Sequence, residues 1–497
     1  MVIHKTVSPS PLQSIFQTET LPALAERALR MVNEETFRRE RVWTPVPPTV
    51  REQVLEQLLP ERGLDAERIL QLFQELILPY EGGNRHPRFA AWIIPPPEPL
   101  GVIGELLTAV INLNAGVGDH IAPILERHVL DWLKEVLDLR PWTDYHGILT
   151  SGSTTASTTC LAAARYWAAE QQGWNIRDDG FQSSHAPLVV YASEQAHSSL
   201  QKALEELGFG SRYYRRITVN EGYQIDLAAL RHAIAADRAA GLIPSIVIAT
   251  TGTVNTGAID PLGNLADLCE EEGLWLHIDG AYGAFGRFHP ELADHYQGME
   301  RAHSLALDAH KMLCVPIECG VALVREGNFL HKNYSLVPEY LHASGIAWQS
   351  EYGLQLSRSF RALKLWMTML HYGQSGLELL VKHQCALGSQ MASRIQHDPD
   401  FALVAGGLSI CCFRYQPAAQ TPAFLDTLNR VLPDQVQERG RAFLSGTWLD
   451  RPVLRACFVH PLSTVQDIEA IIEEVRFCGM QVQRESACPS RLHQADA

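Results

Sequence analysis

Apolar positions recur at two different spacings along the chain, and the change of spacing divides it into three parts. Within residues 1–95, apolar side chains return every three or four positions around 21–32 and 69–77, which predicts amphipathic helices. A proline-rich connector at 46–48 separates these two patterns. The helices lack a core of their own, so we expect an N-terminal arm that packs on another surface, with a partner subunit as the obvious candidate.

Between residues 96 and 370, short β-rich runs alternate with helical patterns, for example at 226–240 and 262–272. Strands that alternate with helices predict a mostly parallel sheet covered by helices on both faces. We therefore expect a large α/β domain over this range. The apolar runs that read as its buried strands are 188–191, 246–249, 274–278 and 321–324.

Residues 371–497 mix helical patterns with two further strand-like runs, 408–413 and 453–458. This mixture predicts a smaller α+β domain at the C-terminal end. The expected fold class is therefore α/β, with a helical N-terminal arm (1–95), a large domain (96–370) and a small domain (371–497). A chain of 497 residues is indeed too long for one ordinary core.

Composition and charge narrow the possible functions. Hydrophobic residues make up 46% of the chain and charged residues 20%, as in ordinary globular proteins. The formal net charge of −15 argues against general binding of nucleic acid or anionic membranes, because both need a basic face. No apolar stretch reaches membrane-spanning length, and the first thirty residues show no signal-peptide pattern. The ten cysteines form no CxxC pair, so we expect reduced thiols, no metal site and a cytoplasmic location.

The segment 304–311 carries the strongest candidate for chemistry. A short apolar strand is followed by Asp308, Ala309, His310 and Lys311, which places the lysine just beyond the carboxyl end of a buried strand. Ligands of open α/β sheets bind at that edge. A lysine held against apolar surroundings loses its charge readily and can form an imine. Taken alone, such a lysine is more often a surface residue, so the interpretation depends on its companions.

Two companions follow other predicted strands. Asp279 ends the run 274–278 and is followed by small residues, including Ala281. Its carboxylate can pair with a protonated pyridine nitrogen, although a turn or helix cap is an equally good explanation of a single Asp. His197 follows the run 188–191 and precedes a helical pattern. Its ring can stack on a cofactor, or it can simply cap the helix.

A third companion is the run of small and hydroxyl residues at 150–156, which includes Ser153 and Thr154 and leads into a helical pattern. Backbone amides at a helix start, with hydroxyl groups around them, form a phosphate cradle. The run is not a Walker loop, since no GK[ST] follows it. The chain also has no GxGxxG after a strand, which argues against a nicotinamide dehydrogenase.

Together, the stretches 150–156, 191–199, 277–283 and 304–311 resemble the group II decarboxylases that depend on pyridoxal 5′-phosphate (PLP), the family of aromatic-L-amino-acid decarboxylase. The resemblance covers about residues 20–480, nearly the whole chain. The further stretches that carry it are 86–89, 123–126, 249–261, 358–366 and 454–461.

This resemblance implies the PLP-dependent transferase fold of the aspartate-aminotransferase type (fold type I) and an obligate homodimer with active sites at the subunit interface. It matches Lys311 to the Schiff-base lysine, Asp279 to the partner of the ring nitrogen and His197 to the stacking histidine. Where the family often has a second threonine after Thr253, this chain has Val254. The remaining cofactor residues that the resemblance implies are Ser153, Thr154, Thr253, Ala281, Asp308 and His310.

The implied reaction is decarboxylation of an amino acid to an amine and CO₂. Residues 89–97 align with the part of the family that lines the substrate side chain, and we expect an aromatic or aliphatic substrate because they are apolar, with Arg88 as the only basic group nearby. The side chains expected to line the substrate are those of Phe89, Trp92, Ile94 and Pro95.

One departure from the family leaves the outcome of the reaction open. The family protonates Cα with a tyrosine on a mobile loop, and counting back from Phe360 gives Gln349 at that position. Gln349 does not titrate near neutral pH, so either Tyr340 or Tyr352 replaces the acid, or the intermediate reacts otherwise, for example with oxygen to give an aldehyde. A shifted alignment of this variable loop is the third explanation. Transamination, lyase chemistry and a catalytically silent PLP-fold binding protein remain as further alternatives.

Overall fold

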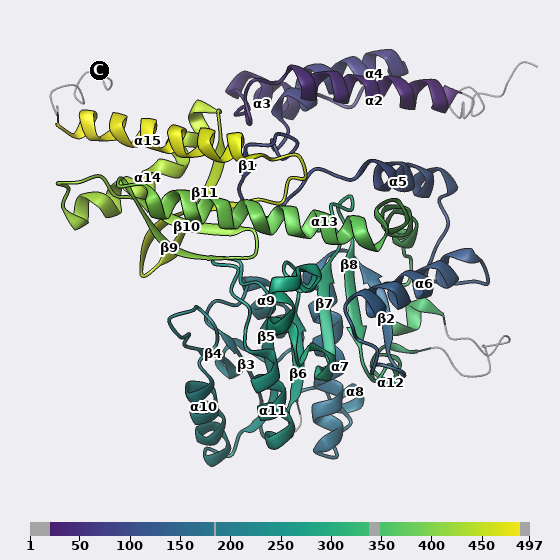
Figure 1. The fold of residues 1–497 in the computed structure, drawn as a ribbon. Coiled ribbons are helices and arrows are strands. Elements are labelled where there is room, and N and C mark those ends of the chain that lie inside the picture. Colours follow the sequence, from purple (N-terminus) through teal and green to yellow (C-terminus); the bar gives the residue numbers. More distant parts are fainter. Residues whose placement is uncertain (1–19, 183–184, 337–347, 488–497) are drawn as a thin grey trace, which may run out of the picture.

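The computed structural model describes residues 20–182, 185–336 and 348–487. Two sheets organise these residues, a large one of seven strands and a smaller one of five (Figure 1). The helical arm lies apart from both sheets, at the top of the view in Figure 1.

The large sheet contains all four strands predicted for the large α/β range. Its strands run parallel to one another except β8, which is antiparallel to both of its neighbours. The predicted mostly parallel sheet is thereby confirmed. In spatial order the strands are β2 (His146–Thr150), β8 (Gly320–Val324), β7 (Ser304–Asp308), β6 (Trp275–Asp279), β5 (Ile243–Thr250), β3 (Leu188–Ser193) and β4 (Tyr214–Ile217).

Helices cover both faces of the large sheet, because its strands are apolar on both sides. One face packs against α7 (Ser153–Gln171), α9 (Ser198–Glu206) and α12 (Asn328–Tyr334). The opposite face packs against α6 (Ile121–Val136), α10 (Leu227–Ala239), α11 (Leu262–Glu272) and the first part of α13 (Arg361–His397). The short helices α5 (Pro99–Ile111) and α8 (Ile176–Asp179) complete this part.

The small sheet contains both strands predicted near the C-terminal end, and it also takes up a strand from the N-terminal range. Its strands in order are β1 (Phe89–Ala90), β11 (Phe443–Leu449), β12 (Arg451–Cys457), β10 (Ile410–Tyr415) and β9 (Phe401–Gly407). Helices α13, α14 (Pro422–Arg439) and α15 (Val465–Ala487) supply the apolar residues of its core. Because β1 pairs with β11, the chain just after the arm is built into the small sheet.

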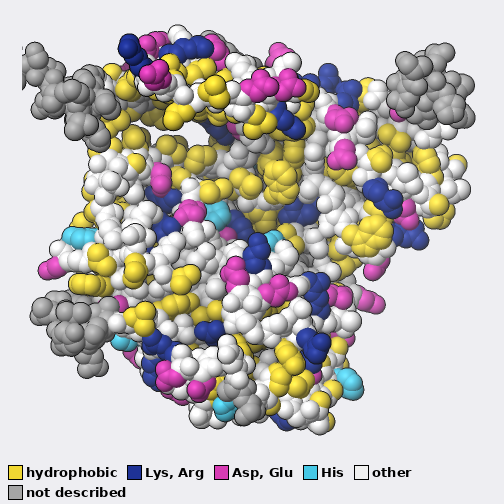
Figure 2. Space-filling model, turned by 180° about the vertical axis from the view of Figure 1, so that it is seen from behind, with side chains coloured by type: hydrophobic (Ala, Val, Ile, Leu, Met, Phe, Trp, Pro, Cys, Tyr) yellow, Lys and Arg dark blue, Asp and Glu magenta, His cyan; other side chains and the backbone are white. Residues whose placement is uncertain are grey.

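The arm consists of α2 (Leu21–Arg38), α3 (Pro48–Leu55) and α4 (Ala66–Leu72), and α4 continues into a π-helical segment at Phe73–Ile77 and a 3₁₀ turn at Leu78–Tyr80. Pro48 is the first residue of α3 and not part of a connector, as proline favours that position. Figure 2 shows a hollow beneath the arm with hydrophobic side chains along it. No helix among the described residues is long and apolar enough to cross a membrane.

Candidate active site

The carboxyl ends of three neighbouring strands bring polar side chains to one side of the large sheet. Ile246 and Ile248 of β5 pack in the core on the α7 side, so the alternation of side chains also turns Thr250 to that side. The parallel register pairs Thr250 directly with Asp279, the last residue of β6. Asp308 ends β7, the next strand, on the same side. The three residues therefore form the floor of one site.

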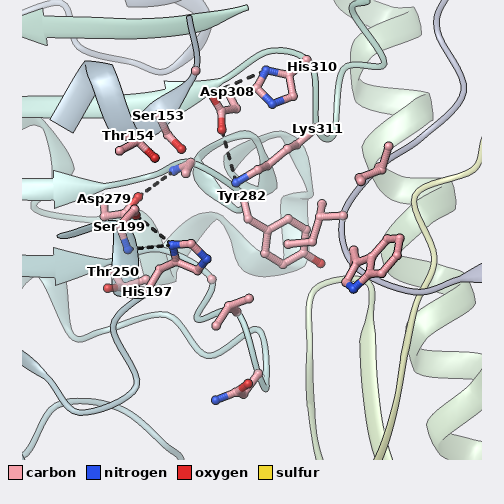
Figure 3. Close-up of a pocket in the computed structure, with 18 of the residues that line it drawn as sticks. Ser153, Thr154, His197, Ser199, Thr250, Asp279, Tyr282, Asp308, His310 and Lys311 are labelled. Atoms are coloured by element: carbon pink, nitrogen blue, oxygen red, sulfur yellow. Dashed lines mark hydrogen bonds and ion pairs between the residues drawn. The ribbon is translucent and has the colours of Figure 1, made fainter. Parts of the chain in front are cut away.

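A cavity of about 610 Å³ opens above these strand ends. The large sheet supplies one wall, and residues of β11 and β12 and the segment after β1 supply the other. Figure 3 shows the labelled polar side chains around the cavity. Of the residues predicted for cofactor and catalysis, those that line it are Ser153, Thr154, His197, Asp279, Ala281, Asp308, His310 and Lys311.

The start of α7 has the properties of a phosphate cradle. Gly152, which precedes the helix, has φ 110°, a backbone conformation that residues with a side chain rarely adopt. No side chain caps this end of the helix. The free amide groups and the helix dipole therefore face the cavity beside Ser153 and Thr154 and attract an anion.

Lys311 follows β7 and reaches into the cavity, where its Nζ lies 3.2 Å from Asp308 Oδ2. The amine is thus held by a carboxylate, and not by the apolar surroundings that the sequence led us to expect. Asp308 is 2% exposed, and its Oδ1 has no hydrogen-bond partner among the described residues. His310 accepts a hydrogen bond from the Cys319 amide at Nδ1, so the neutral ring carries its proton at Nε2.

Asp279 is 5% exposed and lies where its carboxylate meets the cavity. The Ala281 amide donates a hydrogen bond of 3.1 Å to its Oδ1. Burial raises the pKa of Asp279, while the nearby Lys311 ammonium, the Ala281 amide and His197 act in the opposite direction. A carboxylate buried in this way is best stabilised by a cation in the cavity.

His197 caps α9, as one of the two interpretations of its sequence position expected, and it also lines the cavity. Its Nδ1 accepts a hydrogen bond of 3.2 Å from the Ser199 amide and lies 2.8 Å from Ser199 Oγ. Because Nδ1 accepts, the neutral ring carries its proton at Nε2. The cap fixes the ring at the cavity wall shared with Asp279 (Figure 3).

Thr253 does not line the cavity, in contrast to the contact expected from its place in the cofactor-side loop. Its side chain is fully buried, 2.8 Å from Thr256 Oγ1, and accepts a hydrogen bond from the Ala258 amide. Its hydroxyl therefore holds the turn between β5 and α11. The neighbouring Gly252 and Val254 do line the cavity.

The predicted substrate residues divide into two pairs. Trp92 and Ile94 line the cavity, whereas Phe89 and Pro95 do not. Phe89 belongs to β1, which turns its ring into a small apolar cluster, with 5.0 Å between its centroid and that of Phe443. Pro95 is buried outside the set of residues that line the cavity. The sequence alone did not show that β1 pairs with β11 and turns Phe89 away.

Of the two tyrosines considered as proton donors, the structure describes Tyr352, which does not line the cavity. Tyr352 stacks on His146, with 3.4 Å between the ring centroids, at the start of β2 and therefore at the opposite end of that strand from the cradle. Gln349 is 6% exposed and does not line the cavity. Tyr340 lies outside the described residues. Tyr282 lines the cavity, but its hydroxyl is 2.6 Å from Ser409 Oγ.

Several lining residues were missed by the sequence analysis, and Arg455 and Thr250 are two of them. Arg455 of β12 is 3% exposed, donates hydrogen bonds to the carbonyl oxygens of Val254 and Trp92, and has no partner for Nη2 among the described residues. A charged residue inside the apolar run 453–458 was the signal for it. Thr250 ends β5 just as Asp279 ends β6, and the same rule of strand ends would have selected it.

These features fit PLP. The uncapped start of α7 suits the phosphate, Asp279 suits a protonated ring nitrogen, and Lys311 supplies an amine between them. Ala281 is small enough for a ring to lie close to the backbone. Asp308 Oδ1, which makes no hydrogen bond among the described residues and lies 3.6 Å from His310 Nδ1, and the Thr250 hydroxyl are polar groups that a ligand in this cavity would meet.

Known proteins agree with this assignment. The model of the pyridoxal-dependent decarboxylase conserved domain matches residues 48–416. An aromatic-L-amino-acid decarboxylase of Bacillus atrophaeus is 32% identical over 460 residues, spanning 89% of this chain and 92% of the relative. A phenylacetaldehyde synthase of Arabidopsis thaliana is 29% identical over 452 residues, spanning 86% and 91%.

Solved structures of known proteins also share the fold of this chain. The crystal structure of Oryza sativa TDC with PLP and tryptamine superposes with a TM-score of 0.88 at 26% identity, covering 96% of this chain and all of the other. The expected PLP-dependent transferase fold of type I is thereby confirmed. With a family model that matches most of its length and relatives that span it nearly from end to end, the chain belongs to the pyridoxal-dependent decarboxylase family.

Proposed function

We propose that this protein removes the carboxyl group of an amino acid with an aromatic side chain and releases CO₂ and an amine. The observation that carries the proposal is the arrangement of Lys311 and Asp279 at neighbouring strand ends, in one cavity with the uncapped start of α7. An amine, a buried carboxylate and an anion cradle at these positions match three polar groups of PLP: the aldehyde, the ring nitrogen and the phosphate.

When bound, PLP supplies a protonated pyridine ring that accepts the electron pair left by the departing CO₂. The residues of this chain divide the supporting tasks. Ser153 and Thr154 hold the phosphate, Lys311 attaches the cofactor covalently, and Asp279 keeps the proton on the ring nitrogen. His197, fixed by its own helix cap at the cavity wall, would pack against the ring of the cofactor.

The reaction is tested by supplying the PLP-loaded protein with single L-amino acids and measuring CO₂, amine, aldehyde, ammonia and peroxide together. We expect amine and CO₂ in equal amounts from an aromatic amino acid. Tyr352→Phe should leave rate and product unchanged within about twofold, because Tyr352 packs on His146 away from the cavity. Aldehyde, ammonia, peroxide and CO₂ in equal amounts, with one O₂ consumed, would favour the oxidative alternative. Absence of CO₂ from every amino acid would contradict the proposal.

An aromatic substrate is favoured by the outer wall of the cavity. Trp92 is 52% exposed and lines this wall with Ile94 and Val254. Its φ of 51° is unusual for a residue with a bulky side chain, and such strain persists only where the surroundings hold it, often at ligand sites. Here the Arg455 Nη1 hydrogen bond to the Trp92 carbonyl oxygen, 3.3 Å long, helps to hold it.

Removing this indole tests the substrate class. Trp92→Ala should lower kcat/KM for aromatic amino acids by roughly 5–30-fold, the loss of about 1–2 kcal/mol of ring contact. The kcat/KM for leucine or methionine should change much less. The matched control is Phe89→Leu, whose ring is buried outside the cavity and should affect stability more than selectivity. An unchanged ratio of aromatic to aliphatic kcat/KM in Trp92→Ala would argue against the assignment.

A second candidate substrate has an acidic side chain, and Arg455 is the observation that favours it. A buried guanidinium with an unpartnered Nη2 is well placed to bind an anion. Pairing with the departing carboxylate would stabilise the substrate more than the transition state, which loses that charge, so a side-chain carboxylate is the better partner. The same screen decides between the candidates: glutamate or aspartate with the highest kcat/KM, lost in Arg455→Met, would replace the aromatic proposal.

We further propose a cytoplasmic homodimer. Exposed apolar side chains lie on the arm and on neighbouring helices, including Leu55 (78%), Ile111 (54%), Ile121 (60%) and Ile124 (62%). Hydrophobic side chains along the hollow beneath the arm support a partner subunit at this place (Figure 2). The cysteines of the described residues are all buried and free, which fits a reducing compartment.

A further inference from the structure

The hydroxyl group of Thr250 has an unusual environment at the end of a buried strand. It is 4% exposed, and its Oγ1 has no hydrogen-bond partner among the described residues. The same residue lines the cavity (Figure 3). A buried hydroxyl without a partner lowers stability, since it has lost water and gained nothing in return. Such a group at a cavity wall is explained most simply by a partner that the cavity supplies.

The backbone around Thr250 is fixed, although its hydroxyl is free. The Thr250 amide donates a hydrogen bond of 2.8 Å to Asp260 Oδ2, and the Ile225 amide donates one of 2.8 Å to Asp260 Oδ1. Asp260 is fully buried, and burial raises its pKa to about 6. These bonds hold the end of β5 in place, so the direction in which the Thr250 side chain leaves the strand is set in advance.

The side chain of Thr250 leaves β5 on the same face of the sheet as the side chain of Asp279. The parallel register pairs Thr250 with Asp279, and paired residues of neighbouring strands carry their side chains on the same face, about 5 Å apart. Within the described residues, the Asp279 carboxylate accepts one hydrogen bond, from the Ala281 amide. A carboxylate can accept several, and each donor favours its ionised form.

We propose that Thr250 is a positioning residue for the bound cofactor: its hydroxyl donates to the Asp279 carboxylate once that carboxylate turns to the ring nitrogen of PLP. The inference rests on the proposed use of PLP and deepens it. The hydroxyl has no hydrogen-bond partner among the described residues and would gain one when PLP binds. Its bond fixes the orientation of Asp279 and helps to keep it ionised, so the effect of Thr250 should appear first in cofactor affinity.

The test compares Thr250→Val, which has the same shape but no hydroxyl, with Thr250→Ser, which retains the hydroxyl. The dissociation constant of PLP is measured by titration of the apoprotein. We expect Thr250→Val to weaken PLP binding about tenfold, the size of one hydrogen bond to a charged group, and Thr250→Ser to stay within about twofold of wild type. The melting temperature of the Thr250→Val apoprotein should be equal to or above that of wild type, because an unpartnered buried hydroxyl has been removed.

Thr251 provides a matched control in the same chain. It is fully buried, its Oγ1 likewise has no partner among the described residues, and it does not line the cavity. Thr251→Val should therefore leave PLP affinity unchanged. An equal loss of affinity in Thr251→Val, or unchanged affinity in Thr250→Val, would overturn the proposal. A wild-type protein that binds no PLP would instead overturn the proposed function itself.

A double-mutant cycle separates an action through Asp279 from a direct contact with the cofactor. In an Asp279→Asn background, Thr250→Val should change PLP affinity by less than about twofold, because the carboxylate that the hydroxyl serves is already gone. A weaker signature is expected in the spectrum: Thr250→Val should shift the absorbance of bound PLP in the same direction as Asp279→Asn. An undiminished tenfold loss in the Asp279→Asn background would contradict the assignment to Asp279.

Discussion

Lys311→Ala is expected to abolish turnover, with kcat lowered by about 10⁴–10⁶-fold, the scale found when a covalent catalytic group is removed. The physical reason is that no other amine of the described residues lines the cavity, so nothing else there can attach the cofactor covalently. The variant should still bind PLP through the cradle at the start of α7. The measurements are steady-state CO₂ release and borohydride reduction of the loaded protein, followed by peptide mass spectrometry.

The control for this change is Lys332→Ala, which removes a lysine that is paired with Glu170 at 2.9 Å on the surface. That variant should keep its activity, and its reduced cofactor should remain on the peptide with Lys311. Recovery of the reduced adduct on any other lysine of the wild-type protein would refute the role of Lys311. Retention of more than about one hundredth of wild-type kcat in Lys311→Ala would do the same.

The residues at strand ends were predictable because one rule governs them all. Lys311, Asp279 and His197 each follow an apolar run, and parallel strands end at the same edge of a sheet. The local sequence pattern was enough to find them, because each of these residues lies within a few sequence positions of the strand that it follows. The cradle at Ser153 was predictable for a similar reason, because a run of small residues precedes a helix.

The residues that were placed wrongly or missed depend on contacts between distant parts of the chain. Phe89 points away from the cavity because β1 pairs with β11, more than 350 residues later. Arg455 reaches the cavity only because β12 lies against Val254 and Trp92. Such pairings leave no periodic signal in the sequence, since nothing in β1 alone specifies its partner strand. Thr253 was misplaced for a local reason. Its hydroxyl accepts a hydrogen bond from the Ala258 amide and so stabilises its own turn.

The second large effect is expected for Asp279→Asn, which should lower kcat by about 10²–10⁴-fold while the fold remains intact. Asparagine has the same shape and can still accept the hydrogen bond from the Ala281 amide. It carries no charge, however, and therefore cannot hold a proton on the ring nitrogen of the bound cofactor. Since the site is buried, the lost charge is not replaced by solvent, and the ring becomes a much weaker acceptor of electrons.

This loss should come with a change in the absorption spectrum of bound PLP and its pH dependence, which a purely structural defect would not produce. Asp226→Asn is the matched control, because Asp226 accepts the same kind of hydrogen bond, from the Ala228 amide at the start of α10, and does not line the cavity. It should alter stability slightly and kcat not at all. If Asp279→Asn changes kcat by less than about threefold, the buried carboxylate is not what keeps the ring protonated, and the Asp308 carboxylate becomes the next group to examine.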